Sequence, residues 1–173
     1  TDVEVVDPEN GEVAMSVGEA GELRIRGPQM ITEYWNRPEE SANLVRDGWL
    51  YTGDIGHFDI DGRLTIVDRK KDMVIVGGYN VFPREIDEVL FAHPDIQEAA
   101  VIGVPDSHRG EAVQAFVVPI EGANPAPDEI IGYCAKNLAK FKVPSEIHIV
   151  DSLPKTPAAK IDKLALRNSF LKT

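Results

Sequence analysis

The sequence predicts an α+β fold in which a β-rich segment precedes a smaller unit that mixes helices with strands. In residues 1–70, short runs alternate apolar and charged side chains, which is the pattern of half-buried strands. In residues 71–173, segments of helical periodicity are interspersed with apolar runs of strand length. The chain has 173 residues, of which 43% are hydrophobic, so it can form a globular core.

In the first segment, we expect strands at residues 3–6 and 22–26. Asp61-Gly62, between residues 58–60 and 64–67, predicts a hairpin because both turn residues tolerate a positive φ. The segment is short, and no closure of its sheet is visible in the sequence. We therefore expect it to be the end of a larger N-terminal domain, and the chain to be a fragment.

The second segment begins at the charged pair Lys70-Lys71, where we place a boundary between domains 1–70 and 71–173. Pro83 is placed to open a helix that Pro94 ends, with its apolar residues on one face. The elements expected after this helix are strands at 98–104 and 112–119, joined by the polar connection 105–110, a helix near 128–139, a strand at 146–150 and a short helix from Asp162.

The charge balance limits the possible partners. The net charge of −11 argues against a nucleic-acid partner, which requires a basic surface. The single Cys134 excludes an intramolecular disulfide, and its apolar helical face predicts a buried thiol. The four histidines are scattered without metal-ligand spacing, so we expect no protein-bound metal. No apolar run is long enough for a membrane span, and we expect a cytoplasmic protein, with peripheral membrane association only through its substrate.

Two residues of the first segment are candidates for binding a nucleotide. Asp54 follows Thr52-Gly53, where a carboxylate could accept both hydroxyls of a ribose. The alternative is a turn aspartate that binds local backbone N–H groups. Arg69 ends a strand, and its planar guanidinium could reach ribose or phosphate oxygens. The alternative is a solvated charge beside two lysines.

Two further candidates lie in the second segment. Gly77-Gly78-Tyr79 follows an apolar strand and suits a close approach of the backbone to an extended ligand, or else a bulge or tight turn. Lys160 lies on a Pro-containing loop, residues 153–162, and could neutralise charge between a carboxylate and an α-phosphate. The alternative is an idle, solvent-exposed lysine.

Taken together, these stretches resemble the adenylate-forming superfamily of acyl-CoA synthetases, adenylation domains and luciferases, and especially its fatty-acyl-CoA ligase branch. The resemblance covers nearly the whole chain. It is carried by Gly21–Pro28, Tyr34–Glu39, Tyr51–Asp54, Asp68–Asp72, Pro105–Glu111 and the Lys160 loop.

The resemblance implies a role for each candidate. Asp54, Ile66 and Arg69 would bind ATP, and Lys160 would be the lysine that forms the acyl-adenylate. Lys71 would be the hinge, and Gly77, Gly78 and Tyr79 would line the path of CoA. Residues 1–70 would end the large ATP- and acyl-binding domain, and residues 71–173 would be the mobile lid.

The implied cofactors are ATP with its Mg²⁺, which no residue of this chain would hold, and CoA as co-substrate. The implied partners are a carboxylic acid, a medium- or long-chain fatty acid, and the N-terminal domain of the same protein. The fragment alone would be inactive. Two alternatives remain: an adenylation domain that loads a carrier protein, and a non-catalytic binding module. Ala159 stands where the family commonly has Gly. If this position needs a positive φ, alanine destabilises the loop by about 1 kcal/mol relative to glycine.

Overall fold

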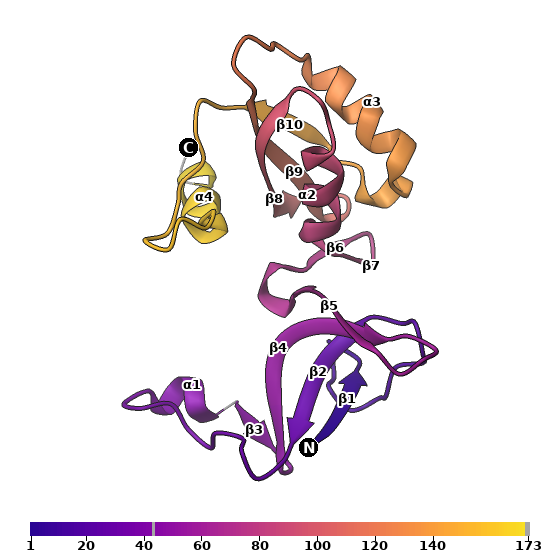
Figure 1. The fold of residues 1–173 in the computed structure, drawn as a ribbon, viewed down its shortest axis with the longest axis vertical. Helices are drawn as coiled ribbons and strands as arrows, with labels where there is room; N and C mark the ends of the chain where they lie inside the picture. Colours follow the sequence, from indigo (N-terminus) through magenta and orange to yellow (C-terminus); the bar gives the residue numbers. More distant parts are fainter. Residues whose placement is uncertain (43, 172–173) are drawn as a thin grey trace. The chain divides into compact units, whose positions relative to one another are not determined.

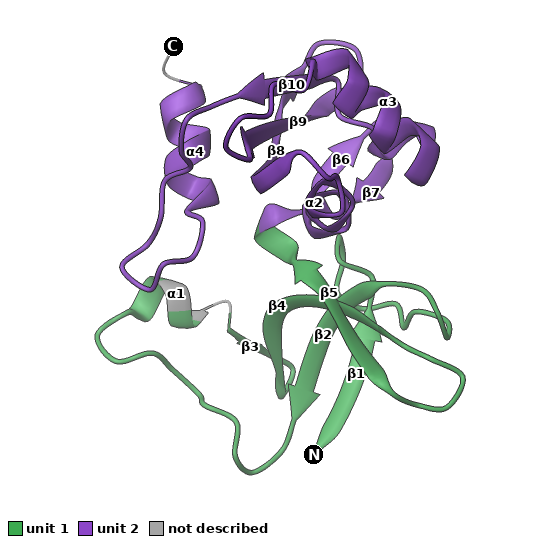
Figure 2. Cartoon of the chain, turned by 45° about the horizontal axis from the view of Figure 1, so that its top comes forward, with its two compact units in different colours: residues 1–71 green, residues 72–173 purple. Residues whose placement is uncertain are grey.

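The computed structural model describes residues 1–42 and 44–171 (Figure 1). The chain divides into two compact units, residues 1–71 and 72–173, which we call unit 1 and unit 2 (Figure 2). The predicted α+β class is confirmed. The structural division falls one residue after the boundary expected between residues 70 and 71. The assignment of these units to the end of a large domain and a mobile lid stays a prediction.

Unit 1 is built on an antiparallel sheet centred on one long strand. Its elements are β1 (Asp2–Val6), β2 (Gly21–Arg26), α1 (Pro38–Ala42), β3 (Val45–Arg46), β4 (Trp49–Phe58) and β5 (Leu64–Arg69). Strand β4 pairs with β2, β3 and β5. The predicted strands at 3–6 and 22–26 are confirmed, whereas α1 and β3 were not expected.

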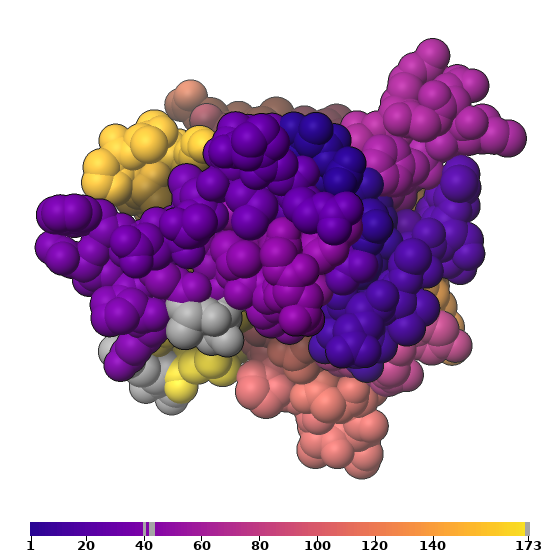
Figure 3. Space-filling model, turned by 90° about the horizontal axis from the view of Figure 1, so that it is seen from below, coloured from indigo at the N-terminus to yellow at the C-terminus, as the bar shows by residue number. Residues whose placement is uncertain are grey.

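The predicted hairpin around Asp61-Gly62 joins β4 to β5, starting from the pair Phe58 and Leu64. Of the two turn residues, only Gly62 has a positive φ, of 77°. The reason is a local side chain: Asp59 accepts hydrogen bonds from the backbone N–H groups of Asp61 at 2.9 Å and Arg63 at 2.8 Å. The turn therefore widens into a loop, and this tip stands out from the surface of unit 1 (Figure 3).

Unit 2 contains the second sheet, in the order β10-β9-β6-β7, with β8 also paired to β9. Its strands are β6 (Val74–Val76), β7 (Tyr79–Val81), β8 (Ile96–Asp106), β9 (Gly110–Pro119) and β10 (Glu146–Ile149). Strands β8 and β9 form a long antiparallel hairpin, and β10 joins β9 in parallel. The strands predicted for this part of the chain are confirmed.

Helices cover both faces of this sheet. They are α2 (Pro83–Phe91), α3 (Pro127–Asn137) and α4 (Lys163–Phe170). The 3₁₀ turn η2 (Lys140–Lys142) follows α3, and the 3₁₀ turn η1 (Lys70–Asp72) lies at the division between the units. Alternate residues of β8 and β9 point to opposite faces, as the period of a strand requires. One face forms a buried cluster with α2 and α3, and the other forms a second cluster with Leu166 of α4. Unit 2 is thus a three-layer α/β/α structure with its own core.

The predicted buried thiol is confirmed, since Cys134 of α3 is fully buried beside Ile130. Burial raises the pKa of the Cys134 thiol to about 11, so the thiol stays protonated at neutral pH. Among the described residues, no helix has the length and apolar character needed to cross a bilayer.

Candidate functional site

The structure brings two of the predicted nucleotide-binding residues together on neighbouring strands. Asp54 of β4 lies opposite Arg69 of β5, and the Arg69 Nε atom is 2.7 Å from Asp54 Oδ1. Their side chains are 31% and 61% exposed, so both remain accessible to a ligand. Ile66 lies on the same strand as Arg69 and is partly exposed.

A β-bulge produces this pairing. From the hairpin inward, Gly56 pairs with Ile66, and then the register shifts so that Ile55 pairs with Asp68. Without the extra residue, Asp68 would lie opposite Asp54, and two like charges would face each other across the ladder. Gly56 suits the bulge because a Cβ there would be 2.5 Å from the Thr65 carbonyl oxygen. The bulge therefore places a guanidinium, rather than a carboxylate, beside Asp54.

The chemistry of this pair suits a polyol ligand. One carboxylate oxygen of Asp54 is bound to Arg69, and the side chain retains acceptor capacity for hydroxyl groups. Gly53 has a φ of 70° immediately before Asp54, a conformation that favours glycine. The alternative, a turn aspartate that binds only local backbone N–H groups, is less favoured because Asp54 lies within strand β4.

The two lysines after Arg69 lie at the end of unit 1. The Lys70 ammonium is 2.7 Å from a carboxylate oxygen of Glu22, whose side chain is only 4% exposed. Lys70 is therefore fixed to β2, whereas Lys71 is the last residue of unit 1, at the division between the units.

In unit 2, Gly77 and Gly78 form the tight turn of the β6–β7 hairpin. Their φ values are 58° and 86°, and Val76 pairs directly with Tyr79. Positive φ at both positions is typical of a two-residue hairpin turn, the alternative that the sequence left open. A Cβ at either glycine would meet no atom within 4 Å, so the backbone here is open to approach.

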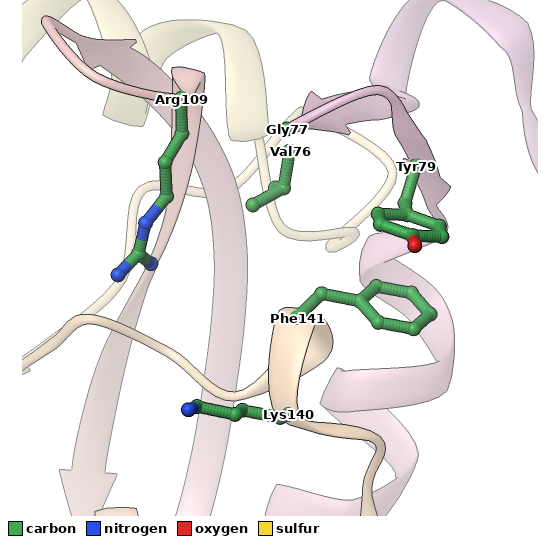
Figure 4. A pocket seen from close by; sticks show the side chains of 6 residues that line it. All are labelled: Val76, Gly77, Tyr79, Arg109, Lys140 and Phe141. Atoms are coloured by element: carbon green, nitrogen blue, oxygen red, sulfur yellow. The ribbon is translucent and has the colours of Figure 1, made fainter.

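A pocket of about 420 Å³ adjoins this turn and is lined by Val76, Gly77, Tyr79, Arg109, Lys140 and Phe141. The Tyr79 and Phe141 rings stack with centroids 4.6 Å apart. The cationic ends of Arg109 and Lys140 lie on the other side of the pocket from these rings (Figure 4). The Gly77 N–H donates to the Arg109 carbonyl at 2.9 Å, which fixes the turn to the β8–β9 loop.

Sequence reasoning did not single out Arg109, Lys140 or Phe141 as site residues. The available signal was an aromatic residue between two lysines in Lys140-Phe141-Lys142. Lys142 turns out to be structural, because its ammonium lies 2.6 Å from Glu85 of α2.

The Lys160 loop is an ordered small hairpin. Lys155 and Ile161 form a β-bridge, and the Thr156 N–H donates to the Lys160 carbonyl at 2.8 Å. Ala159 has a φ of 58°, so this position does adopt the left-handed conformation that favours glycine. Among the described residues, the Lys160 ammonium has no hydrogen bond or ion pair.

Three comparisons with known proteins agree with the resemblance. Residues 85–160 match the AMP-binding enzyme C-terminal domain family. The chain belongs to the adenylate-forming superfamily and corresponds to the C-terminal region of its members. It is 48% identical over 161 residues to a long-chain-fatty-acid–CoA ligase of Bacillus subtilis, in an alignment covering 93% of this chain and 29% of that protein.

The chain is also 44% identical over 155 residues to a 2-succinylbenzoate–CoA ligase of Geobacillus kaustophilus, covering 90% of this chain and 32% of that protein. Its fold matches ATP-bound MatB of Rhodopseudomonas palustris with a TM-score of 0.88 and 38% identity, over 98% of this chain and 34% of that one. The chain thus spans about 30% of the length of these relatives.

The candidate residues for binding a cofactor are divided between the two units. Asp54 and Arg69 lie in unit 1, whereas the pocket and Lys160 lie in unit 2. Within the described ranges, no group of three or more His, Cys, Asp or Glu side chains could hold a metal ion.

Proposed function

We propose that this chain is the C-terminal part of an ATP-dependent acyl-CoA ligase that acts on a medium- or long-chain fatty acid. The carboxylate attacks the α-phosphorus of Mg-ATP, which releases pyrophosphate and forms an acyl-adenylate. The CoA thiolate then attacks the acyl carbon, and AMP leaves. The fatty-acid specificity is supported by the similarity to the B. subtilis protein named as a long-chain ligase.

The observation that carries this proposal is that an ordered hairpin holds Lys160. The ammonium of this lysine is unengaged among the described residues. A solvated lysine needs no such support, whereas a cation that must meet developing negative charge has to be held in place beforehand. In our proposal, Lys160 binds the reacting carboxylate and the α-phosphate during adenylate formation.

Asp54 and Arg69 would bind the nucleotide. The Asp54 carboxylate accepts hydrogen bonds from ribose hydroxyls, and Arg69 both orients that carboxylate and supports ribose or phosphate oxygens. Ile66 supplies apolar contact near the nucleotide. ATP supplies the leaving pyrophosphate and carries its own Mg²⁺.

The pocket beside Gly77, Gly78 and Tyr79 supports CoA as the acceptor. Two cationic side chains and a stacked aromatic pair match the phosphates and the apolar parts of such a molecule. Unit 2 would present Lys160 for the first half-reaction and this pocket for the second, turning about Lys71. The independent core of unit 2 is what such a rigid-body motion needs.

The test uses the full-length protein that contains this chain. Lys160→Ala should reduce carboxylate-dependent ATP–pyrophosphate exchange by about 10²–10³-fold, the effect of removing one preorganised charge-stabilising group. Thioester formation from preformed acyl-adenylate should be retained. Lys136→Ala, which removes an exposed lysine of α3, is the matched control and should leave both half-reactions unchanged.

Survival of both half-reactions in the Lys160→Ala protein would refute the role of this lysine. Thioester formation with a carrier protein but not with free CoA would favour the adenylation domain. A full-length protein without any carboxylate-dependent exchange would favour a binding module. A panel of fatty acids beside 2-succinylbenzoate would test the substrate class.

A further inference from the structure

The loop that carries Lys160 is anchored by a lysine at each end. Lys155 reaches Glu98 of β8, with its Nζ atom 2.6 Å from Glu98 Oε1. Lys163 reaches Asp87 of α2, with its Nζ atom 2.6 Å from Asp87 Oδ2. These anchors join the loop to elements more than fifty residues earlier in the chain.

The Asp87 anchor is the more buried of the two. The side chains of Asp87 and Lys163 are 12% and 23% exposed, against 27% and 46% for Glu98 and Lys155. The second oxygen of Asp87 accepts a hydrogen bond from the Val101 N–H at 2.9 Å. One carboxylate therefore fixes α2, β8 and the start of α4 to one another.

Stability alone is a poor reason for such a pair. Moving two charged groups out of water costs several kcal/mol of desolvation free energy, and their mutual attraction in the interior often does little more than offset this cost. A buried ion pair does fix geometry well. If either group moves, the attraction between the two charges is lost, whereas the cost of burying them remains. Asp87 lies on the core side of α2, where an apolar residue would pack without this cost.

The geometry fixed here includes the position of Lys160. Lys163 is the first residue of α4 and follows Lys160 by three residues. Asp162 caps the same helix by accepting from the Ala165 N–H at 2.9 Å, and its own N–H donates to the Pro154 carbonyl at 2.8 Å. The two ends of the hairpin are therefore joined at Pro154 and Asp162, and the ion pair between Lys163 and Asp87 attaches this end of the hairpin to α2.

We propose that Asp87 is a positioning residue for adenylate formation, acting on Lys160 through Lys163. This inference rests on the proposed function, in which Lys160 acts in the first half-reaction. In this proposal, Asp87 acts without contacting substrate or cofactor, because its carboxylate is bound to Val101 and Lys163. Its charge keeps the Lys160 hairpin in the orientation that adenylation requires.

The test is Asp87→Asn in the full-length protein, which keeps the side-chain size and an acceptor for the Val101 N–H. The kcat of ATP–pyrophosphate exchange should fall about 10- to 100-fold, as expected for a small misplacement of a catalytic group. The KM for ATP should stay within about twofold, because the proposed nucleotide-binding residues Asp54 and Arg69 are unchanged. Thioester formation from preformed acyl-adenylate should also stay within about twofold, because Lys160 is not used in that step. Glu88→Gln is the control, since it removes a carboxylate from the exposed side of the same helix.

A double-mutant cycle separates positioning from stability. In the Lys160→Ala background, Asp87→Asn should cause no further loss of exchange, because it acts through a lysine that is already absent. Lys163→Arg keeps the ion pair and should retain most of the activity. An equal loss of both half-reactions, an unchanged exchange rate, or a loss that persists without Lys160 would each overturn the inference. If Lys160→Ala itself retains exchange, the proposed function fails instead.

Discussion

The two units hold their predicted functional residues in different ways. In unit 1, Asp54 and Arg69 face each other within a β-ladder, so backbone pairing and one ion pair fix both. In unit 2, Lys160 lies on a loop, and the lysines on either side of it, Lys155 and Lys163, form ion pairs with side chains of β8 and α2. The ladder needs only the register of two adjacent strands, whereas the loop needs contacts from distant parts of the chain.

The units also differ in how they bury apolar surface. Both buried hydrophobic clusters of the described residues lie in unit 2, one on each face of its sheet. Unit 1 buries its apolar residues mainly along β1, β2 and β4. A unit with its own core can move as one body while a loop on its surface keeps its shape.

The largest effect is expected from a cavity in the core of unit 2. Ile86 of α2 is fully buried, and Ile86→Ala should lower the free energy of unfolding of unit 2 by about 2–5 kcal/mol. Because unit 2 has its own core, calorimetry of the full-length protein should show a lower temperature only for the transition that unfolds unit 2. Ile55→Ala, at an equally buried position of unit 1, should lower the other transition. A single transition that shifts as a whole in both variants would contradict the division into units.

The same contrast explains what the sequence could and could not predict. Helix α2 was predictable because Pro83 at its start and the apolar spacing of Ile86 and Leu90 are local signals. The β8–β9 hairpin was predictable because the polar connection 105–110 separates two apolar runs of strand length. The local patterns therefore gave the α+β class and most of the elements.

Relations between distant residues were not predictable in this way. Counting outward from the β4–β5 hairpin pairs Asp54 with Asp68, and only the bulge moves Arg69 into that place. Nothing in the spacing of Asp87 and Lys163 indicates that they meet, because the contact depends on how α4 packs on the sheet. Arg109 and Phe141 likewise meet at one pocket only through tertiary structure.

A smaller effect should follow from changing the ladder site of unit 1. Arg69→Lys keeps the charge but loses the planar fork, so we expect about a tenfold lower kcat/KM for ATP in the exchange reaction, or about 1.4 kcal/mol. Stability should change by less than about 1 kcal/mol, because the pair with Asp54 is largely exposed. Arg63→Lys at the exposed hairpin tip is the matched control. Equal kcat/KM values for the two variants would remove Arg69 from the nucleotide site.

The smallest effect concerns the backbone of the loop in unit 2. Ala159 has a φ of 58°, which costs an L-residue about 1–2 kcal/mol, while glycine loses about 0.5–1 kcal/mol more chain entropy on folding. Ala159→Gly should therefore raise the free energy of unfolding of unit 2 by about 0.5–1 kcal/mol, measured by urea denaturation. Gly122→Ala makes the reverse change at a φ of 83° with open space for the Cβ, and should lower it by a similar amount. If Ala159→Gly destabilises unit 2 instead, the conformational freedom that glycine adds to the unfolded chain exceeds the strain it relieves. The side-chain anchors at Lys155 and Lys163 would then hold the loop without storing strain at Ala159.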